Sequence, residues 1–159
     1  MKAQDIMTRN PACCTASDTV QHAARLMAEH DCGCIPVVDD LRSKKIAGTI
    51  TDRDIACRCT AEGGSPDTPV GELMSPNPSC CGPDADVRDA VRIMAERQVR
   101  RVPIVDKDGC CVGIIAQADL ARAEDRGISD QEVGRVVERV SRPARRPRSE
   151  GDAVRPEVR

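Results

Sequence analysis

The first half of the chain alternates between apolar positions at helical spacing and short runs that are wholly apolar. A helix is predicted over residues 19–30 because one of its faces carries Val20, Ala23, Ala24 and Met27. Residues 35–38 form an apolar run typical of a buried strand, and residues 46–50 are predicted to pair with them. A second helix is predicted to begin near Thr51. The predicted order is therefore a short strand, a helix, two strands and a second helix.

The same pattern returns in the second half, displaced by 67 residues and, after one loop, by 65. Residues 35–39 read Ile-Pro-Val-Val-Asp, and residues 102–106 read Val-Pro-Ile-Val-Asp. An alignment that holds over about fifty positions with one two-residue insertion indicates an internal duplication. The second copy is predicted to form its helices and strands over residues 86–97, 102–105, 111–115 and 117–123.

Each copy is too short to be expected to fold alone. A unit of about 60 residues buries too little surface to be stable alone, so we expect the copies to pack face to face around a cleft. The predicted fold class is α/β (α+β), with two pseudo-symmetric β-α-β-β-α domains. The expected order is a first domain, a flexible linker containing Gly-Gly-Ser-Pro, a second domain, a C-terminal helix and a disordered tail, over residues 1–60, 61–71, 72–125, 126–141 and 142–159.

The absence of Phe, Tyr and Trp narrows the possible functions. It excludes nucleic-acid surfaces that stack bases on aromatic rings. No run approaches the roughly 18 apolar residues of a membrane helix, and the N-terminus lacks the apolar stretch of a signal peptide. A soluble, cytoplasmic protein is therefore expected, with its ten cysteines reduced.

The C-terminal region concentrates positive charge, although the formal net charge of the chain is −2. Residues 139–148 contain five arginines and no acid. Ser129 and Glu132 have capping-box spacing, which predicts a short helix that packs on the module or on a partner subunit. The Arg- and Pro-rich tail beyond it is interpreted as solubilising, with contact to nucleic acid or an acidic partner as the alternative.

The cysteines suggest a metal site, but their spacing does not favour one. Four thiolates can hold a structural zinc ion. However, the pairs at 32 and 34 and at 57 and 59 have one intervening residue, and alternate residues on a strand share a face. No metal site is therefore predicted. The doublets at 13–14, 80–81 and 110–111 fall in predicted strands, where one cysteine of each would face the core. The duplication also brings together no Ser-His-Asp or Cys-His set, so no catalytic residues are predicted.

Two further segments complete a family resemblance. Residues 48–54 read Gly-Thr-Ile-Thr-Asp-Arg-Asp, and residues 98–103 read Gln-Val-Arg-Arg-Val-Pro. Together with the duplicated Pro-containing cores, they resemble cystathionine-β-synthase-type (CBS) domains, and the tandem resembles a Bateman module. The resemblance covers about residues 3–123 and extends to small stand-alone bacterial CBS-pair proteins of the hypoxic response type.

The resemblance implies a regulatory module and not an enzyme. Such modules pair their copies about a pseudo-twofold axis and offer two clefts for AMP, ADP, ATP, NAD or S-adenosylmethionine. The resemblance also implies a homodimer and an effector protein that the sequence does not identify. The expected function is a non-catalytic adenine-nucleotide sensor. The alternative is a cysteine-based redox or metal sensor whose nucleotide clefts are vestigial.

The resemblance places a main cleft at the Thr-x-x-Asp of the first copy. Asp54 can accept hydrogen bonds from both ribose hydroxyls, and Thr51 stands where helix N–H groups face an anion. Because no aromatic ring is present, the adenine is expected between aliphatic side chains such as Val99 and Pro78. The complete predicted set for the main cleft is Thr51, Arg53, Asp54, Ser75, Pro78, Ser79, Val99, Arg100 and Arg101, with the arginines contacting phosphate. Thr51 and Asp54 also have capping-box spacing, which needs no ligand.

A second, weaker cleft is predicted at the corresponding place in the second copy. Ala116 stands where the family usually has Ser or Thr, and residues 32–34 read Cys-Gly-Cys in place of the basic pair. Asp119 remains, although an acid in a first helical turn is also explained by the helix dipole. The predicted set for this weaker cleft is Thr8, Ala12, Cys13, Cys32, Gly33, Cys34 and Asp119.

Overall fold

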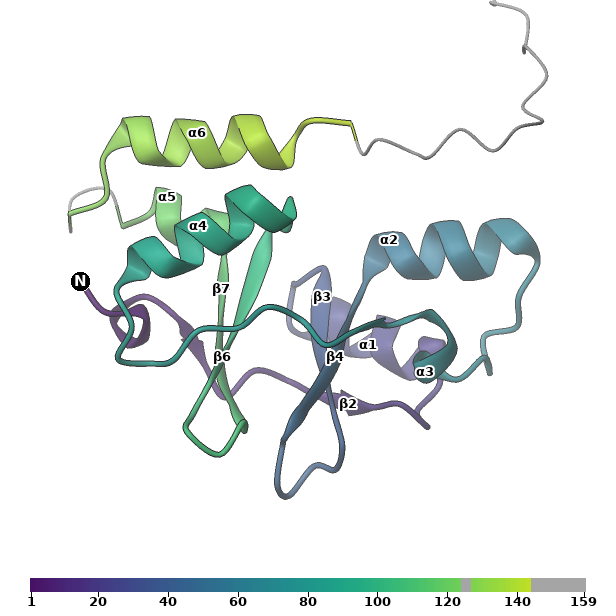
Figure 1. The fold of residues 1–159 in the computed structure, drawn as a ribbon. Helices are drawn as coiled ribbons and strands as arrows, with labels where there is room; N and C mark the ends of the chain where they lie inside the picture. Colours follow the sequence, from purple (N-terminus) through teal and green to yellow (C-terminus); the bar gives the residue numbers. More distant parts are fainter. Residues whose placement is uncertain (124–126, 144–159) are drawn as a thin grey trace, which may run out of the picture.

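The computed structural model describes residues 1–123 and 127–143 and shows two halves side by side, each built on a β-hairpin with helices against it (Figure 1). The first copy contains η1 (Ala3–Asp5), β1 (Thr8–Arg9), β2 (Cys14–Thr15), α1 (Val20–Glu29), β3 (Cys34–Val38), β4 (Ile46–Thr51) and α2 (Asp52–Asp54). α2 continues through a π-helical turn, η2 (Ile55–Cys59), and a 3-10 turn, η3 (Thr60–Glu62).

The second copy repeats this order, which confirms the predicted α/β class and the pseudo-symmetric pair. It contains α3 (Val70–Leu73), β5 (Ser75–Pro76), α4 (Val87–Arg97), β6 (Arg101–Val105), β7 (Cys111–Ala116) and α5 (Gln117–Ala121). A further helix, α6 (Asp130–Val140), follows where the Ser129 capping box predicts one. The tail from residue 144 onward lies outside the described residues, so its predicted disorder stays a prediction.

The long helices form where the apolar stripes predict them. The Thr19 hydroxyl accepts a hydrogen bond of 3.1 Å from the His22 N–H and so caps α1. α1 buries Val20, Ala23 and Met27, and α4 buries the matching Val87, Ala90 and Met94. The duplication therefore preserves the buried face of the helix as well as its position.

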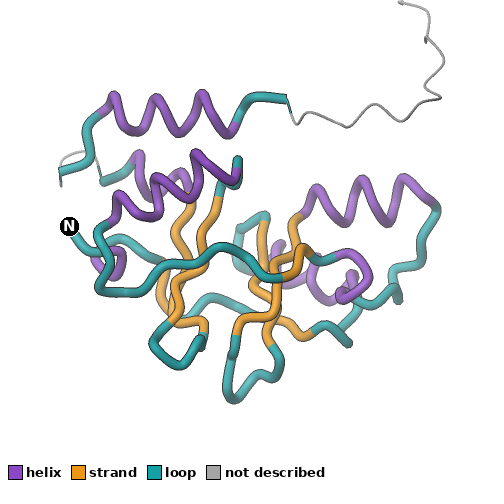
Figure 2. The backbone as a smooth tube through the Cα atoms, viewed as in Figure 1, coloured by secondary structure: helices purple, strands orange, loops and turns teal. Residues whose placement is uncertain are grey.

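The N-terminal segment of each copy crosses to the other copy, where it adds a strand to the hairpin (Figure 2). β1 pairs antiparallel with β7, so that Thr8 lies opposite Ile114. β5 pairs in the same way with β4, so that Ser75 lies opposite Thr49. The resulting sheets have the orders β1-β7-β6 and β2-β3-β4-β5. Each sheet is thus completed by residues that belong to the other repeat.

Two glycines permit this crossing. A Cβ atom at Gly48 would lie 2.8 Å from the Ser75 carbonyl oxygen and 2.9 Å from the Met74 sulfur. At the matching Gly113, a Cβ atom would collide with the side chain of Met7. Glycine is therefore needed at both places because the crossing strand lies directly over the hairpin.

Matched hydrogen bonds hold the crossing segments in place. The Val20 N–H donates to the Thr68 carbonyl at 2.9 Å, and the Val87 N–H donates to the Met1 carbonyl at 3.0 Å. The two hairpins also meet directly, through an antiparallel bridge between Lys45 and Cys110. The later part of the predicted linker is therefore bonded to the first copy at the start of α1.

The two copies have separate apolar clusters. The first contains Ile35, Val37 and Ile50, and the second contains Ile104 and Ile115. α6 joins the second cluster through three buried side chains, Val133, Val136 and Val140. The sequence left open whether this helix packs on the module or on a partner subunit. In the structure it packs on the module.

Candidate functional site

The predicted main cleft centres on the junction between β4 and α2. Thr51 ends β4, and its backbone N–H and its hydroxyl both donate to Asp54 Oδ2 at 2.9 Å. The Asp54 N–H in turn donates to Thr51 Oγ1 at 3.1 Å. The capping box expected from the sequence is therefore formed without a ligand, and it holds the Asp54 carboxylate in one orientation.

This box occupies only one of the two Asp54 oxygens. Oδ1 lies 3.9 Å from the Arg58 guanidinium, and the Asp54 side chain is 18% exposed. At that distance Arg58 makes an ion pair but no hydrogen bond, so Oδ1 can still accept hydrogen bonds. The Asp54 side chain is thus oriented, partly buried and able to accept further bonds.

Arg58 is a residue that the predicted site does not include. Its Nη1 donates to the Leu73 carbonyl at 2.7 Å, at the end of α3. It therefore links Asp54 to the segment that leads into β5 and Ser75. The acid–base spacing of four residues on a predicted helix was the signal that could have revealed it.

Arg101 approaches the same junction from the second copy. Its guanidinium lies 3.3 Å from the position that a Cβ atom of Gly33 would occupy, and the Asp52 carboxylate lies 2.7 Å from that position. The Asp52 N–H also donates to the Gly33 carbonyl at 3.1 Å. Gly33, which was assigned to the weaker cleft, thus makes room for Arg101 beside the start of α2.

The other predicted residues of the main cleft lie on several elements, and the structure shows a contact with β4 for Ser75. Ser75 pairs with β4 two residues before Thr51, and the Asn77 N–H donates to the Ala47 carbonyl at 3.1 Å. The Arg100 carbonyl accepts a hydrogen bond of 2.9 Å from the Gln117 N–H, which fixes the start of β6. The exposed members of the set are Arg53, Ser75, Val99 and Arg100, and the half-buried members besides Thr51 and Asp54 are Pro78, Ser79 and Arg101.

The corresponding junction in the second copy keeps the backbone but lacks the hydroxyl. The Ala116 N–H donates to Asp119 Oδ2 at 2.7 Å, as Thr51 does to Asp54. Asp119 Oδ1 lies 3.8 Å from Arg122, and the side chain is 16% exposed. A single backbone hydrogen bond therefore orients Asp119. Ala116 has no hydroxyl that could contact a phosphate.

The remaining residues of the predicted weaker cleft are divided between two elements. Thr8 is exposed on β1 opposite Ile114, and Ala12 and Cys13 lie half-buried between β1 and β2. Cys32 and Cys34 lie at the start of β3 on the first copy. Burial raises the pKa of the Cys34 thiol to about 12 even though Arg101 lies nearby, so this thiol stays protonated at neutral pH.

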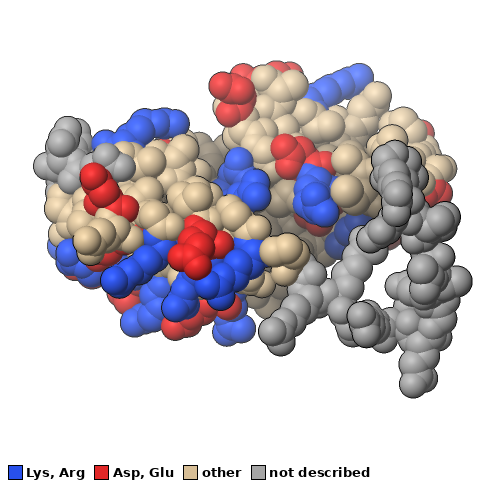
Figure 3. Space-filling view, turned by 90° about the horizontal axis from the view of Figure 1, so that it is seen from above, with Lys and Arg blue, Asp and Glu red and all other residues tan. Residues whose placement is uncertain are grey.

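The helical side of the molecule carries basic and acidic side chains interspersed over both halves (Figure 3). A cavity of about 260 Å³ lies between α4 and α6, and one of about 600 Å³ lies along residues 80–85 and 105–107. Neither of these cavities includes Thr51, Asp54 or Arg101.

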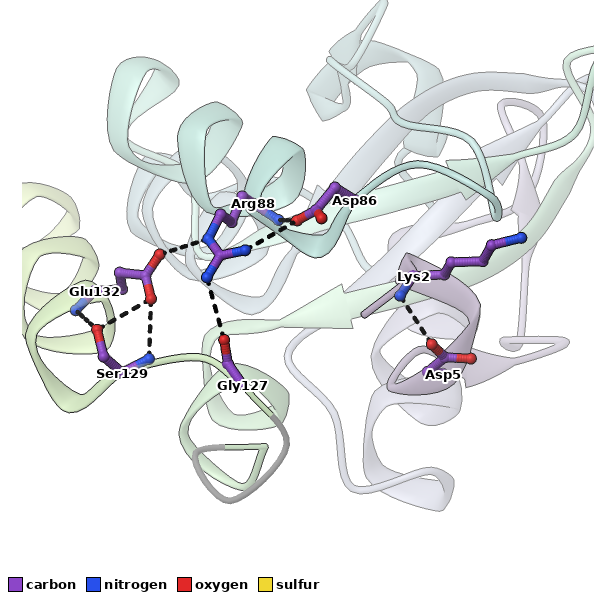
Figure 4. Close-up of polar contacts among 7 residues, drawn as sticks. All are labelled: Lys2, Asp5, Asp86, Arg88, Gly127, Ser129 and Glu132. Atoms are coloured by element: carbon purple, nitrogen blue, oxygen red, sulfur yellow. Dashed lines mark hydrogen bonds and ion pairs between the residues drawn. The ribbon is translucent and has the colours of Figure 1, made fainter.

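Polar contacts fasten α6 to α4 beside the smaller cavity (Figure 4). Arg88 donates through Nε to Glu132 at 2.9 Å and through Nη2 to the Gly127 carbonyl at 3.3 Å. The Ser129 N–H and the Arg88 guanidinium, in that order, lower the pKa of Glu132 to about 2. Glu132 is therefore ionised at neutral pH. It accepts hydrogen bonds from Ser129 in the cap of α6 and forms an ion pair with Arg88.

Within residues 1–123 and 127–143, no three His, Cys, Asp or Glu side chains are grouped so that they could hold a metal ion. The described helices include none with the length and apolarity needed to cross a membrane.

Known proteins resemble the two-repeat part of this chain. The family model described as "CBS domain" matches residues 3–58 and 70–126. The CBS domain-containing protein YhcV of Bacillus subtilis is 40% identical over 138 residues, which cover 87% of this chain and 94% of YhcV. Hypoxic response protein 1 of Mycobacterium tuberculosis is 36% identical over 121 residues, which cover 76% of this chain and 82% of that protein.

Solved structures agree with these relatives. Hypoxic Response Protein I with two coordinated zinc ions is 36% identical, with a TM-score of 0.69 over 77% of this chain and 98% of that one. CBSX2 of Arabidopsis thaliana in complex with AMP is 28% identical, with a TM-score of 0.67 over 79% of this chain and 96% of that one. The duplication, the crossed strands and these matches together establish that the chain belongs to the CBS domain family as a tandem pair.

Proposed function

We propose that the protein is a non-catalytic regulatory module that binds an adenine nucleotide at the main cleft. The observation that carries the proposal is Asp54, whose carboxylate is oriented by Thr51 yet keeps Oδ1 able to accept hydrogen bonds. Ribose hydroxyls match such an acceptor because both can donate to one carboxylate. The AMP complex of CBSX2, a related CBS pair, supports this class of ligand.

The surrounding charges support a ligand that carries phosphate. Arg101 reaches the β4–α2 junction from the second copy, Arg53 is exposed on α2, and Arg100, next to Arg101 in the chain, is also exposed. Arginine makes charge-assisted hydrogen bonds to phosphate oxygens, often through two N–H groups at once. The adenine would lie between the aliphatic side chains of Val99 and Pro78, because the chain has no aromatic ring to stack on it.

A ligand held there would contact both copies, which provides a route to regulation. Asp54 belongs to the first copy and Arg101 to the second, so bound nucleotide favours one arrangement of the copies over others. In our proposal the active form is a homodimer, and an effector protein reads the arrangement. The weaker cleft, with Ala116 in place of a hydroxyl residue, binds a nucleoside weakly or remains empty.

The test is thermal unfolding of the full chain with AMP, ADP, ATP, NAD and S-adenosylmethionine in turn. A ligand at 100 times its Kd should add about 2.7 kcal/mol, which raises the midpoint by roughly 5 to 11 °C at this size. Asp54→Asn and Asp119→Asn form a matched pair, since each alters one cap in one copy.

We expect one nucleotide to raise the midpoint of the unliganded protein, and we expect Asp54→Asn to abolish that rise. Asp119→Asn should retain it. A rise that survives Asp54→Asn would contradict the placement of the site. No rise with any of the five compounds would contradict the nucleotide function itself.

A further inference from the structure

The last turn of α6 is bonded to the residue that follows α4. The Gln98 side-chain amide donates through Nε2 to the Arg139 carbonyl at 3.2 Å. Carbonyls in the last turn of a helix lack partners within the helix, so Gln98 supplies one of these partners from outside. The ion pair between Arg88 and Glu132 bonds the opposite end of α6 to the start of α4 (Figure 4). Polar contacts therefore hold α6 at both ends, and its buried valines hold it between them.

Gln98 has a backbone conformation that is unfavourable for its residue type. It caps the end of α4 with φ of 52° and ψ of 41°, in the left-handed region. Residues other than glycine seldom adopt this region, because Cβ comes too close to the following carbonyl oxygen. The Gln98 N–H and the Val99 N–H both donate to the Met94 carbonyl and hold the chain there. Because φ and ψ set the direction of the side chain, leaving this conformation would break the bond to α6.

Gln98 also begins the segment that reaches the main cleft. Two residues, Val99 and Arg100, lie between it and Arg101. Arg101 is the first residue of β6, and its guanidinium lies beside Gly33 and the start of α2. The segment 98–101 therefore contacts α6 at one end and the β4–α2 junction at the other.

The first copy repeats this left-handed turn without the contact to a further helix. Asp31 matches Gln98 in the duplication and has φ of 47°. The next N–H, that of Cys32, donates to the Met27 carbonyl at 3.0 Å, as in the second copy. Asp31 is exposed, and among the described residues the first copy has no helix that corresponds to α6 (Figure 1). The turn is thus common to both repeats, whereas the bond to α6 belongs to the second.

We propose that nucleotide binding at the main cleft regulates the attachment of α6. A nucleotide bound there restricts the segment 98–101 and keeps Gln98 in its left-handed conformation, so that the bond to Arg139 is made more of the time. This inference rests on the proposed function, because it needs a ligand that contacts the segment.

The coupling acts in both directions. If occupancy of the cleft tightens the last turn of α6, a chain in which that turn is loosened must bind the nucleotide more weakly. α6 lies beyond the two stretches that the family model matches, at 3–58 and 70–126, so the family match gives it no role. In this proposal α6 is the element whose attachment reports whether the main cleft is occupied.

Hydrogen–deuterium exchange of the full chain, measured by mass spectrometry, tests the contact first without ligand. The informative variant is Gln98→Asn, because asparagine adopts the left-handed conformation readily but is one methylene shorter. Asp31→Asn is the matched control at the equivalent turn. Amides 137–141 should exchange roughly two- to tenfold faster in Gln98→Asn, as expected for the loss of one hydrogen bond, and at an unchanged rate in Asp31→Asn.

The second arm adds AMP, ADP, ATP, NAD and S-adenosylmethionine in turn at saturating concentration. Slower exchange at residues 51–58 reports that the main cleft is occupied. We expect the nucleotide that produces this protection also to slow exchange at residues 137–141. Gln98→Asn should lose the protection of α6 and keep that of residues 51–58.

The outcomes separate this inference from the function on which it rests. Protection of residues 51–58 with no change at residues 137–141 would overturn the coupling and leave the nucleotide function in place. Equal protection of α6 in Gln98→Asn, or unchanged exchange of α6 in the unliganded variant, would also overturn it, because the coupling would then not pass through Gln98. If none of the five compounds protects residues 51–58, the nucleotide function fails and the coupling fails with it.

Discussion

The end of β4 in the first copy and the end of β7 in the second have the same backbone but different chemistry. Thr51 has φ and ψ of −114° and 160°, and Ala116 has −99° and 159°. Both N–H groups donate to an aspartate three residues later. Thr51 adds a hydroxyl that Ala116 lacks, and the Arg101 guanidinium of the second copy lies beside the first junction. The duplication has thus kept the backbone geometry of the two junctions while their side chains have diverged.

The helical faces of the two copies differ in a second respect. α6 covers α4 and α5 of the second copy, whereas the first copy has no corresponding helix among the described residues (Figure 1). α6 adds three buried side chains to the second core, and within that core Met94 is 0% exposed whereas the matching Met27 is 7% exposed. The first copy therefore combines the better predicted site with the less enclosed core.

The largest expected effect tests this difference in enclosure. Met94→Ala should lower the free energy of unfolding by about 2–5 kcal/mol, because it leaves a cavity beneath α6. Met27→Ala removes the same atoms from a slightly less buried position and should lower the free energy less. Urea denaturation of the two variants measures both losses. An equal or greater loss in Met27→Ala would show that α6 does not strengthen the second core.

A smaller effect should distinguish the matching thiols Cys13 and Cys80. Cys111 and Lys44 lower the pKa of Cys13, whereas burial and the neighbouring Cys81 raise the pKa of Cys80 to about 11. At neutral pH iodoacetamide should therefore modify Cys13 about tenfold faster, after allowance for the lower nucleophilicity of the more acidic thiol. Mass spectrometry of the two peptides gives the rates.

The same measurement can be made in Cys111→Ala, which removes the Cys111 thiol and leaves Cys13 and Lys44 in place. The reaction of Cys13 should then become slower, while that of Cys80 should change less. If Cys13 reacts no faster than Cys80 in the unmodified chain, the asymmetry between the thiols is absent.

The smallest expected effect exchanges the caps of the two copies. Thr51→Ala removes the hydroxyl that accepts from the Asp54 N–H and should cost about 1 kcal/mol. Ala116→Thr places a hydroxyl on a backbone of the same conformation and should stabilise the protein by a similar amount. Thermal midpoints should move about 2–4 °C in opposite directions. Thr51→Ser should retain the original midpoint, and a loss of stability in Ala116→Thr would contradict the equivalence of the two junctions.

Much of the fold could be predicted from local patterns and their repetition. The apolar stripe that ends in Met27 recurs at Met94, and Thr19 precedes the first helix as a capping residue, so both helices were predictable. The capping box at Thr51 was equally visible. Such features depend on residues a few positions apart, and the duplication shows the same apolar pattern twice.

The features that were not predicted depend on contacts between distant segments. The pairing of β1 with β7 requires the N-terminal segment to cross to the second hairpin, and no local pattern encodes that crossing. The doublets were expected to direct one cysteine each to the core; Cys14 and Cys111 are buried, whereas Cys80 and Cys81 are both half-buried. Their neighbours could not be ranked from the sequence, because their acidity depends on which charges lie nearby in the folded chain.

The crossed N-terminal segments also determine how the molecule can come apart. β1 completes the sheet of the second copy, and β5 completes that of the first. A chain cut between the repeats would leave each fragment without its outer strand and would expose the hairpin edge beside Gly48 or Gly113 to pairing with other chains. Although the chain has two apolar clusters, it should therefore unfold in one cooperative transition, and neither repeat should persist as an independent folding unit.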